Sequence, residues 1–140
     1  MATAEELARE HYQGGYNCAE AVWLGLNEDL TPEQKAFGLK LSSGFGGGMG
    51  SGGLCGGVAA SVMSIGRWYG RDLGGARKDD AKLLAKELVG IVEREYGSVN
   101  CCDLKPNTDD YRKHCIEYVA LCARTAVTLM DRGVVDEDCG

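Results

Sequence analysis

The chain has 140 residues, of which 44% are hydrophobic, a size and composition typical of one soluble globular domain. Its 15 basic and 21 acidic residues give a net charge of −6, which disfavours binding to nucleic acid or to an anionic membrane because phosphate groups would be repelled. No apolar stretch is long enough to span a membrane and the N-terminus lacks a signal-peptide pattern, so the sequence predicts a cytoplasmic protein without membrane insertion.

Helical periodicity recurs along the chain, which contains only 2 prolines. Asn17 and Glu20 form an N-cap and N3 pair typical of a helix start, and Thr31 and Gln34 form a second such pair around Pro32. No segment alternates as a strand does, so the sequence predicts an all-α, single-domain bundle of about five to six helices with a glycine-rich loop before the central helix. The expected helices cover residues 3–12, 17–26, 31–43, 54–69 and 75–96, and a last one runs from a cap at 107 or 108 to 133.

Glycine is concentrated in one segment, since nine of the 21 glycines lie between Gly44 and Gly57. Residues 48–53 match the spacing G-x-G-x-x-G, but no strand precedes them, which disfavours a dinucleotide site. Glycines allow positive φ and a close approach of the backbone to a bound group, and successive N–H groups at a helix start favour an anion. The glycines expected to approach such a group are Gly46, Gly47, Gly48 and Gly56.

The 7 cysteines form no C-x-x-C pair, which argues against thioredoxin-like and zinc-finger patterns. In a reducing compartment, so many thiols indicate metal ligation or redox chemistry more than structural disulfides. The cysteines stand at positions 18, 55, 101, 102, 115, 122 and 139.

Four of these cysteines come from four separate segments and are expected to meet at one point. Cys18 and Cys55 begin helices, where the helix dipole should lower the thiol pKa, whereas Cys122 on an apolar helix face should show no such effect. Cys101 is expected in a loop after a helix that ends at residue 97, and Cys115 lies on the apolar face of the last helix. Cys139 is expected outside this group.

Several stretches also match a known cysteine pattern. They are GYNCAEAV at 15–22, SGFGGGMG at 43–50, CGG at 55–57, GSVNC at 97–101 and Cys115. Together they resemble the redox-active protein family named for its C-GCAxxG-C-C cysteine pattern. The family's Cys-Gly-Ala-x-x-Gly motif has Gly57 in place of Ala and Ala60 in place of the last Gly, both still small residues.

The resemblance implies redox activity through four characteristic cysteines, and the adjacent pair leaves open whether Cys101 or Cys102 is used. We favour an iron–sulfur cluster bound by Cys18, Cys55, Cys101 and Cys115 for electron transfer. One alternative is a metal-free thiol/disulfide oxidoreductase or redox sensor that uses the same cysteines. Another is a helical scaffold or interaction module. The redox readings require a redox partner protein that the sequence does not identify, and an oligomer is compatible with all three.

Overall fold

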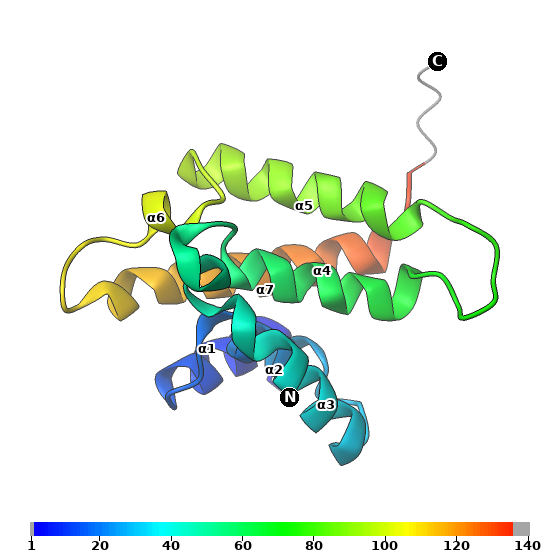
Figure 1. Cartoon of the computed structure of the whole chain (residues 1–140), viewed down its shortest axis with the longest axis horizontal. Helices are drawn as coiled ribbons and strands as arrows, with labels where there is room; N and C mark the ends of the chain where they lie inside the picture. The colour runs from blue at the N-terminus through cyan, green and yellow to red at the C-terminus, as the bar shows by residue number, and fades with distance from the viewer. Residues whose placement is uncertain (1, 136–140) are drawn as a thin grey trace.

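The computed structural model describes residues 2–135, which form seven α-helices and two short irregular helical segments (Figure 1). The predicted all-α fold is confirmed, although a seventh, four-residue helix was not expected. Among the described residues, no helix is both long and apolar enough to cross a membrane. The elements are α1 (Ala4–Gln13), α2 (Cys18–Leu26), α3 (Pro32–Ser42), η1 (Ser43–Phe45), η2 (Gly48–Gly52), α4 (Gly56–Tyr69), α5 (Asp80–Tyr96), α6 (Cys101–Leu104) and α7 (Tyr111–Arg132).

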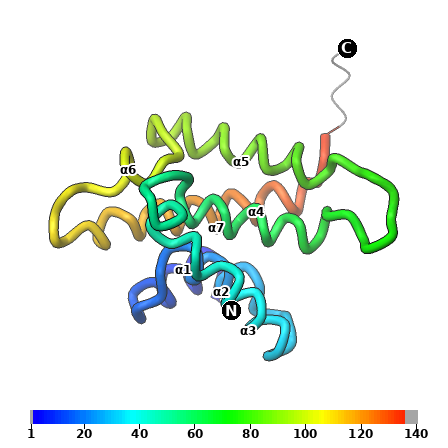
Figure 2. The backbone as a smooth tube through the Cα atoms, in the orientation of Figure 1, coloured from blue at the N-terminus to red at the C-terminus, as the bar shows by residue number. Residues whose placement is uncertain are grey.

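The longer helices form two groups. Helices α4, α5 and α7 run alongside one another and pack pairwise, while α1, α2 and α3 lie together on the other side of α4 and α7 (Figures 1 and 2). Helix α2 lies at the centre of the contacts because it packs against α1, α3, α4 and α7. The glycine-rich segment and α6 gather at the end of the bundle where α4 begins (Figure 1).

Local sequence signals predicted two helix starts and one helix end correctly. The capping boxes at Asn17 and Thr31 are both formed, with the side chain of each N-cap residue accepting a hydrogen bond from the N3 backbone. Gly97 ends α5 in the left-handed conformation that its position as C-cap requires. These boundaries depend only on residues within one turn, which is why the sequence predicts them.

Other predicted boundaries were wrong. Helix α5 begins at Asp80 instead of residue 75, since Gly74 has a φ of 83° and turns the chain before the helix. Helix α7 begins at Tyr111 with Asp110 as N-cap, later than the caps expected at 107 or 108. Helix α4 begins at Gly56 because Leu54 pairs with Asn100 in an isolated antiparallel bridge.

This bridge joins two segments that are far apart in sequence. The Cys55 N–H donates to the Val99 carbonyl at 2.7 Å, and the Cys101 N–H donates to the Gly53 carbonyl at 2.6 Å. Cys101 is the first residue of α6, so the prediction that it lies in a loop was wrong. The bridge holds the start of α4 beside the start of α6.

Small residues let the helices approach closely in the core. Ala8 of α1 and Ala19 and Ala21 of α2 are fully buried. A Cβ on Gly25 would lie 2.8 Å from the Ala4 carbonyl oxygen and 2.9 Å from the Ala8 Cβ, so only glycine fits between these helices. The centre of the other group is aliphatic, with Leu84, Leu88 and Val92 from α5 and Ile65 from α4 fully buried.

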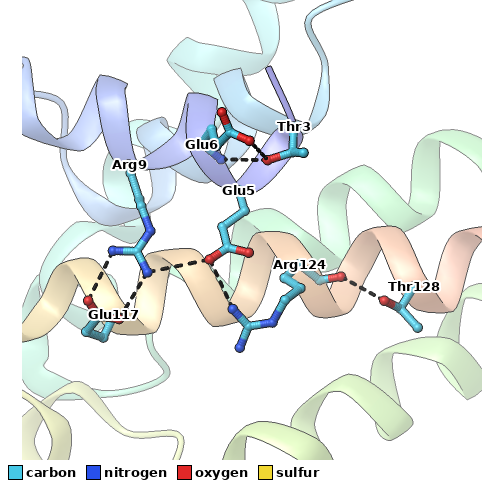
Figure 3. A network of polar contacts seen from close by, with 7 residues as sticks. All are labelled: Thr3, Glu5, Glu6, Arg9, Glu117, Arg124 and Thr128. Atoms are coloured by element: carbon cyan, nitrogen blue, oxygen red, sulfur yellow. Dashed lines mark hydrogen bonds and ion pairs between the residues drawn. The ribbon is translucent and has the colours of Figure 1, made fainter. Parts of the chain in front are cut away.

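A polar network ties α1 to α7 at the surface (Figure 3). Arg9 bonds both oxygens of Glu117 at 3.0 and 3.1 Å, and Glu5 accepts from Arg124 at 3.1 Å. Exposed ion pairs of this kind stabilise a fold only weakly. The two helices that they join both contribute side chains to the cavity described next.

Candidate functional site

A cavity of about 190 Å³ opens at the end of the bundle where α2, α4 and α6 begin. Cys18, Cys55, Cys101 and Cys115 all line it, so the fold brings the four predicted cysteines to one place. Their predicted roles remain predictions. All four carry free thiols in this structure. The other lining side chains include Tyr12, Asn17, Lys105, Tyr111, Arg112 and Tyr118.

Cys18 is the first residue of α2, where the capping box at Asn17 fixes its position. Burial, followed by the nearby Cys55 sulfur, raises the pKa of the Cys18 thiol above its ordinary value. Hydrogen bonds from the N–H groups of Gly47 and Ala19 offset this only in part. The prediction of a lowered pKa for Cys18 was therefore wrong, because burial and neighbouring sulfurs outweigh the helix start.

Cys55 is the N-cap of α4 and is only 6% exposed. A hydrogen bond from the Cys122 thiol lowers the pKa of Cys55 to about 7, with further help from the N–H groups of the first turn of α4, at Gly57 and Val58. These donors outweigh burial, which acts in the opposite direction. Cys55 is thus the most acidic of the clustered thiols. The direction of the shift agrees with the prediction, although its main cause is Cys122 and the start of the helix adds less.

Of the adjacent pair, Cys101 lines the cavity and Cys102 does not. Cys102 is exposed, and its thiol faces the Asp103 carboxylate at 3.8 Å. Burial and the Cys55 sulfur raise the pKa of Cys101, while Lys105 acts to lower it. The geometry therefore assigns the cavity position to Cys101, and Cys139 lies outside the described residues.

Cys115 lies on α7, which also contributes Arg112 and Tyr118 to the lining of the cavity. Burial raises its pKa to about 11, and Cys18, Cys101 and Cys55 add to the effect in that order. Each of these thiols thus makes ionisation of the next less favourable, so the cluster accommodates one thiolate far more easily than several.

The glycine-rich segment reaches the cavity at Gly47, where a run of left-handed residues begins. Gly47, Gly48 and Gly50 have φ values of 66°, 66° and 67°, and Met49 follows the same path at 62°. Of the four glycines expected to approach a bound group, Gly47 and Gly56 line the cavity. The other two pack behind it: a Cβ on Gly46 would lie 2.5 Å from Asn17 Nδ2, and one on Gly48 would lie 2.7 Å from the Cys101 Cβ.

Two cationic side chains border the cavity, and no carboxylate from residues 2–135 lines it. Arg112 stacks on the Tyr12 ring at 3.8 Å and donates to the carbonyls of Tyr12 and Tyr16 at 2.5 and 2.9 Å. The ammonium group of Lys105 lies 4.0 Å from the centre of the Tyr111 ring. These cations make the cavity favourable for anions in a chain that is acidic as a whole.

The sequence did not assign Cys122 to the site, because its position on an apolar helix face is typical of a core residue. It is fully buried outside the cavity, beside Gly57, and it lies close enough to Cys55 for each thiol to shift the pKa of the other. Its spacing of seven residues from Cys115 was a usable signal, since residues seven apart lie on one face of a helix. Cys122 therefore joins the cluster as a fifth sulfur.

Within residues 2–135, no three cysteine, histidine, aspartate or glutamate side chains lie close enough together to hold one metal ion. An iron–sulfur cluster spaces its thiolate ligands more widely, because several iron and sulfide atoms lie between them. The finding thus concerns a single-ion site, and the cluster remains a prediction.

Comparison with known proteins agrees with this cysteine pattern. The chain matches the family described as "Putative redox-active protein (C_GCAxxG_C_C)" over residues 16–129. It is also 31% identical over 115 residues to an uncharacterized protein of Archaeoglobus fulgidus. The aligned region covers 73% of this chain and 71% of that protein. No solved structure matches the chain significantly. As its cysteine pattern predicted, the chain belongs to the C_GCAxxG_C_C family of redox-active proteins.

Proposed function

We propose that the cavity carries out thiol–disulfide exchange, with Cys55 as the attacking thiol. The observation that carries this proposal is the position of Cys55, at the start of α4 and facing a cavity lined by three further cysteines. A thiolate is the nucleophile in such exchange, and one with a pKa near the ambient pH attacks most effectively. Cys55 is the clustered thiol whose pKa is about 7.

The surroundings of Cys55 support a reaction that replaces one disulfide bond by another. Thiols at Cys18, Cys101 and Cys115 line the same cavity and lie within reach of a group attached there. Their raised pKa values keep them protonated while Cys55 is ionised, so one nucleophile acts at a time. The cytoplasm, where the sequence predicts the protein, would maintain these thiols in the reduced state.

The test measures disulfide exchange under anaerobic conditions with the neutral reagent dithiodipyridine. A background in which Cys102 and Cys139 are replaced by Ser removes the exposed thiol of Cys102 and the thiol that the sequence predicts outside the cluster. In this background, Cys55→Ser should abolish the fast phase of exchange, whereas Cys115→Ser should retain an initial attack. If Cys55→Ser reacted as fast as the background protein, the assignment of the nucleophile would be wrong.

An iron–sulfur cluster held by Cys18, Cys55, Cys101 and Cys115 is the second candidate. It is favoured by the number of thiols around one cavity and by the N–H group of Gly47, which already donates to a cysteine sulfur. When bound, the cluster would supply one-electron transfer. Anaerobic purification followed by iron and acid-labile sulfide counts distinguishes the two candidates, since thiol exchange requires neither element.

A further inference from the structure

Cys122 occupies a position that the four-cysteine pattern does not account for. It is fully buried on α7, and a Cβ on Gly57 would lie 3.2 Å from its sulfur. A Cβ on Gly56 would lie 2.7 Å from the Cys18 sulfur. The two glycines that follow Cys55 therefore leave room for two neighbouring thiols, one beside each glycine.

The two neighbouring thiols differ in what can reach them. Cys18 lines the cavity, so a molecule in the cavity contacts it directly. Cys122 does not line the cavity and lies on the core side, beside Gly57, two residues after Cys55. A substrate can therefore meet Cys122 only through a bond already made to Cys55. This is the arrangement required of a thiol that resolves a mixed disulfide without competing for the substrate.

We propose that Cys122 is the resolving thiol of Cys55, so that turnover leaves an intramolecular Cys55–Cys122 disulfide. The inference rests on the proposed thiol–disulfide exchange and names the partner in that reaction. The substrate class is a disulfide small enough to enter the cavity, or the exposed disulfide of a partner protein.

The exchange proceeds in two balanced steps. The Cys55 thiolate attacks one sulfur of the substrate disulfide, a Cys55–substrate bond forms, and the other half leaves as a thiolate that takes a proton from water. Cys122 then loses its proton and attacks the Cys55 sulfur, which forms the Cys55–Cys122 bond and releases the second half as a thiol. Two protein thiols are thereby oxidised and one substrate disulfide is reduced to two thiols.

Disulfide mapping of the otherwise unaltered background protein is the primary test, because it requires no change in the core. The reduced protein lacking Cys102 and Cys139 is treated with one equivalent of dithiodipyridine, quenched with acid, digested and analysed by mass spectrometry. The expected first product is a peptide pair joined through Cys55 and Cys122. A Cys18–Cys55 pair in its place would overturn the proposal.

Variants at Cys122 and Gly57 test the same step. Cys122→Ala should accumulate the mixed disulfide on Cys55 and lose the second equivalent of released thiol, and Cys122→Ser serves as a variant closer in size. Gly57→Ala keeps the thiol but displaces its sulfur, so disulfide closure should slow while the first attack continues. Circular dichroism checks that each variant retains its helices.

The possible failures are distinguishable. If Cys55→Ser leaves the fast exchange unchanged, the proposed function itself fails. If Cys55→Ser abolishes exchange but Cys122→Ala still closes a disulfide at the background rate, only the role of Cys122 is wrong, and the residue is an inert core cysteine.

Discussion

Single residues decide which sulfur in the cluster ionises. Cys18 and Cys55 both stand at helix starts, yet the pKa of Cys18 is raised and that of Cys55 is lowered. The difference comes mainly from Cys122, whose thiol donates to Cys55, while Cys18 is buried beside a sulfur that ionises first. A helix start therefore predicts thiolate character only when burial and neighbouring thiols are also known.

The contact between Gly57 and Cys122 should appear as an energetic coupling. In the wild-type protein, Gly57→Ala should destabilise the fold by about 1 kcal/mol, because the new Cβ would lie 3.2 Å from the Cys122 sulfur. In a Cys122→Ala background, the nearest remaining atoms are ordinary contacts at 3.6 Å. There the same change should stabilise α4 by up to about 1 kcal/mol, through the helix propensity of alanine.

Urea unfolding of the four proteins of this double-mutant cycle measures the coupling. An additive result would mean that the Cys122 sulfur moves aside without cost and that Gly57 is not required by it. A control at Gly90, where a Cβ would meet nothing, should be stabilised by alanine in both backgrounds.

The raised thiol pKa values predict a loss of stability at alkaline pH. The Cys115 thiol has a pKa of about 11 in the folded protein, against 9.0 as its ordinary value. Its contribution is thus fully present below pH 9 and is lost as the pH rises toward 11, because the unfolded chain releases the proton first. Burial also raises the pKa of Tyr12, so its ionisation at alkaline pH destabilises the folded protein in the same way.

Unfolding midpoints in urea, measured under reducing conditions at several pH values, check this prediction. The urea concentration at the midpoint should decrease as the pH is raised above 9. The decrease should be smaller for Cys115→Ala, which removes one of the contributing groups. A midpoint that is independent of pH over this range would contradict the assignment of protonated, buried thiols.

At the scale of elements, the sequence predicted those features of the fold that depend on neighbouring residues. The capping boxes at Asn17 and Thr31 and the end of α5 at Gly97 depend on contacts within one turn. The start of α4 and the existence of α6 depend on pairing between Leu54 and Asn100, which are distant in sequence, and no local pattern reports such pairing.

For the candidate site too, some features could be predicted from local sequence and others could not. Four cysteines on four separate segments were sufficient to anticipate one cluster. Helix starts locate Cys18 and Cys55 and an apolar face locates Cys115, whereas Cys101 was expected in a loop and begins α6. Cys122 was missed because apolar periodicity alone does not distinguish a core cysteine from one that contacts another sulfur. The cationic residues Lys105 and Arg112 were missed because their elements carry no pattern of charge that points to the cavity.

The left-handed turn before α4 should be sensitive to substitution even where a side chain would meet no other atoms. Gly47 has a φ of 66° and open space around its Cβ position, so Gly47→Val would be strained by its backbone alone. We expect a loss of about 1–3 kcal/mol in unfolding free energy and slower alkylation of Cys18, whose sulfur accepts from the Gly47 N–H.

Gly44→Val is the matched control, because Gly44 also has open space but no positive φ. This control should change stability by no more than about 0.5 kcal/mol. Iodoacetamide labelling of Cys18 in both variants separates a role in the site from simple connection. Equal labelling rates in the two variants would show that the segment only connects helices and does not affect Cys18.

At the scale of the whole molecule, charge is distributed unevenly with respect to the cavity. The chain carries a net charge of −6, yet within the described part of the chain the charged side chains that line the cavity are Lys105 and Arg112. Arg112 is held by two backbone carbonyls and the Tyr12 ring, so its position is fixed by α1 and α7 together. A diffusing anion thus meets overall repulsion but local attraction at the cavity mouth.

This distribution predicts selectivity for anionic disulfides among small substrates. Lys105→Gln should slow attack on the dianionic reagent DTNB several-fold relative to neutral dithiodipyridine, and added salt should reduce the difference, because ions screen charges beyond about 10 Å at 0.1 M ionic strength. Taking the ratio of the two rates cancels any change in thiol reactivity, which matters because Lys105 also lowers the pKa of Cys101. Lys113→Gln makes the same change in net charge at an exposed residue of α7 that does not line the cavity, and it should leave the ratio unchanged. A ratio that fell equally in both variants would show that net charge, and not the cavity cation, selects the substrate.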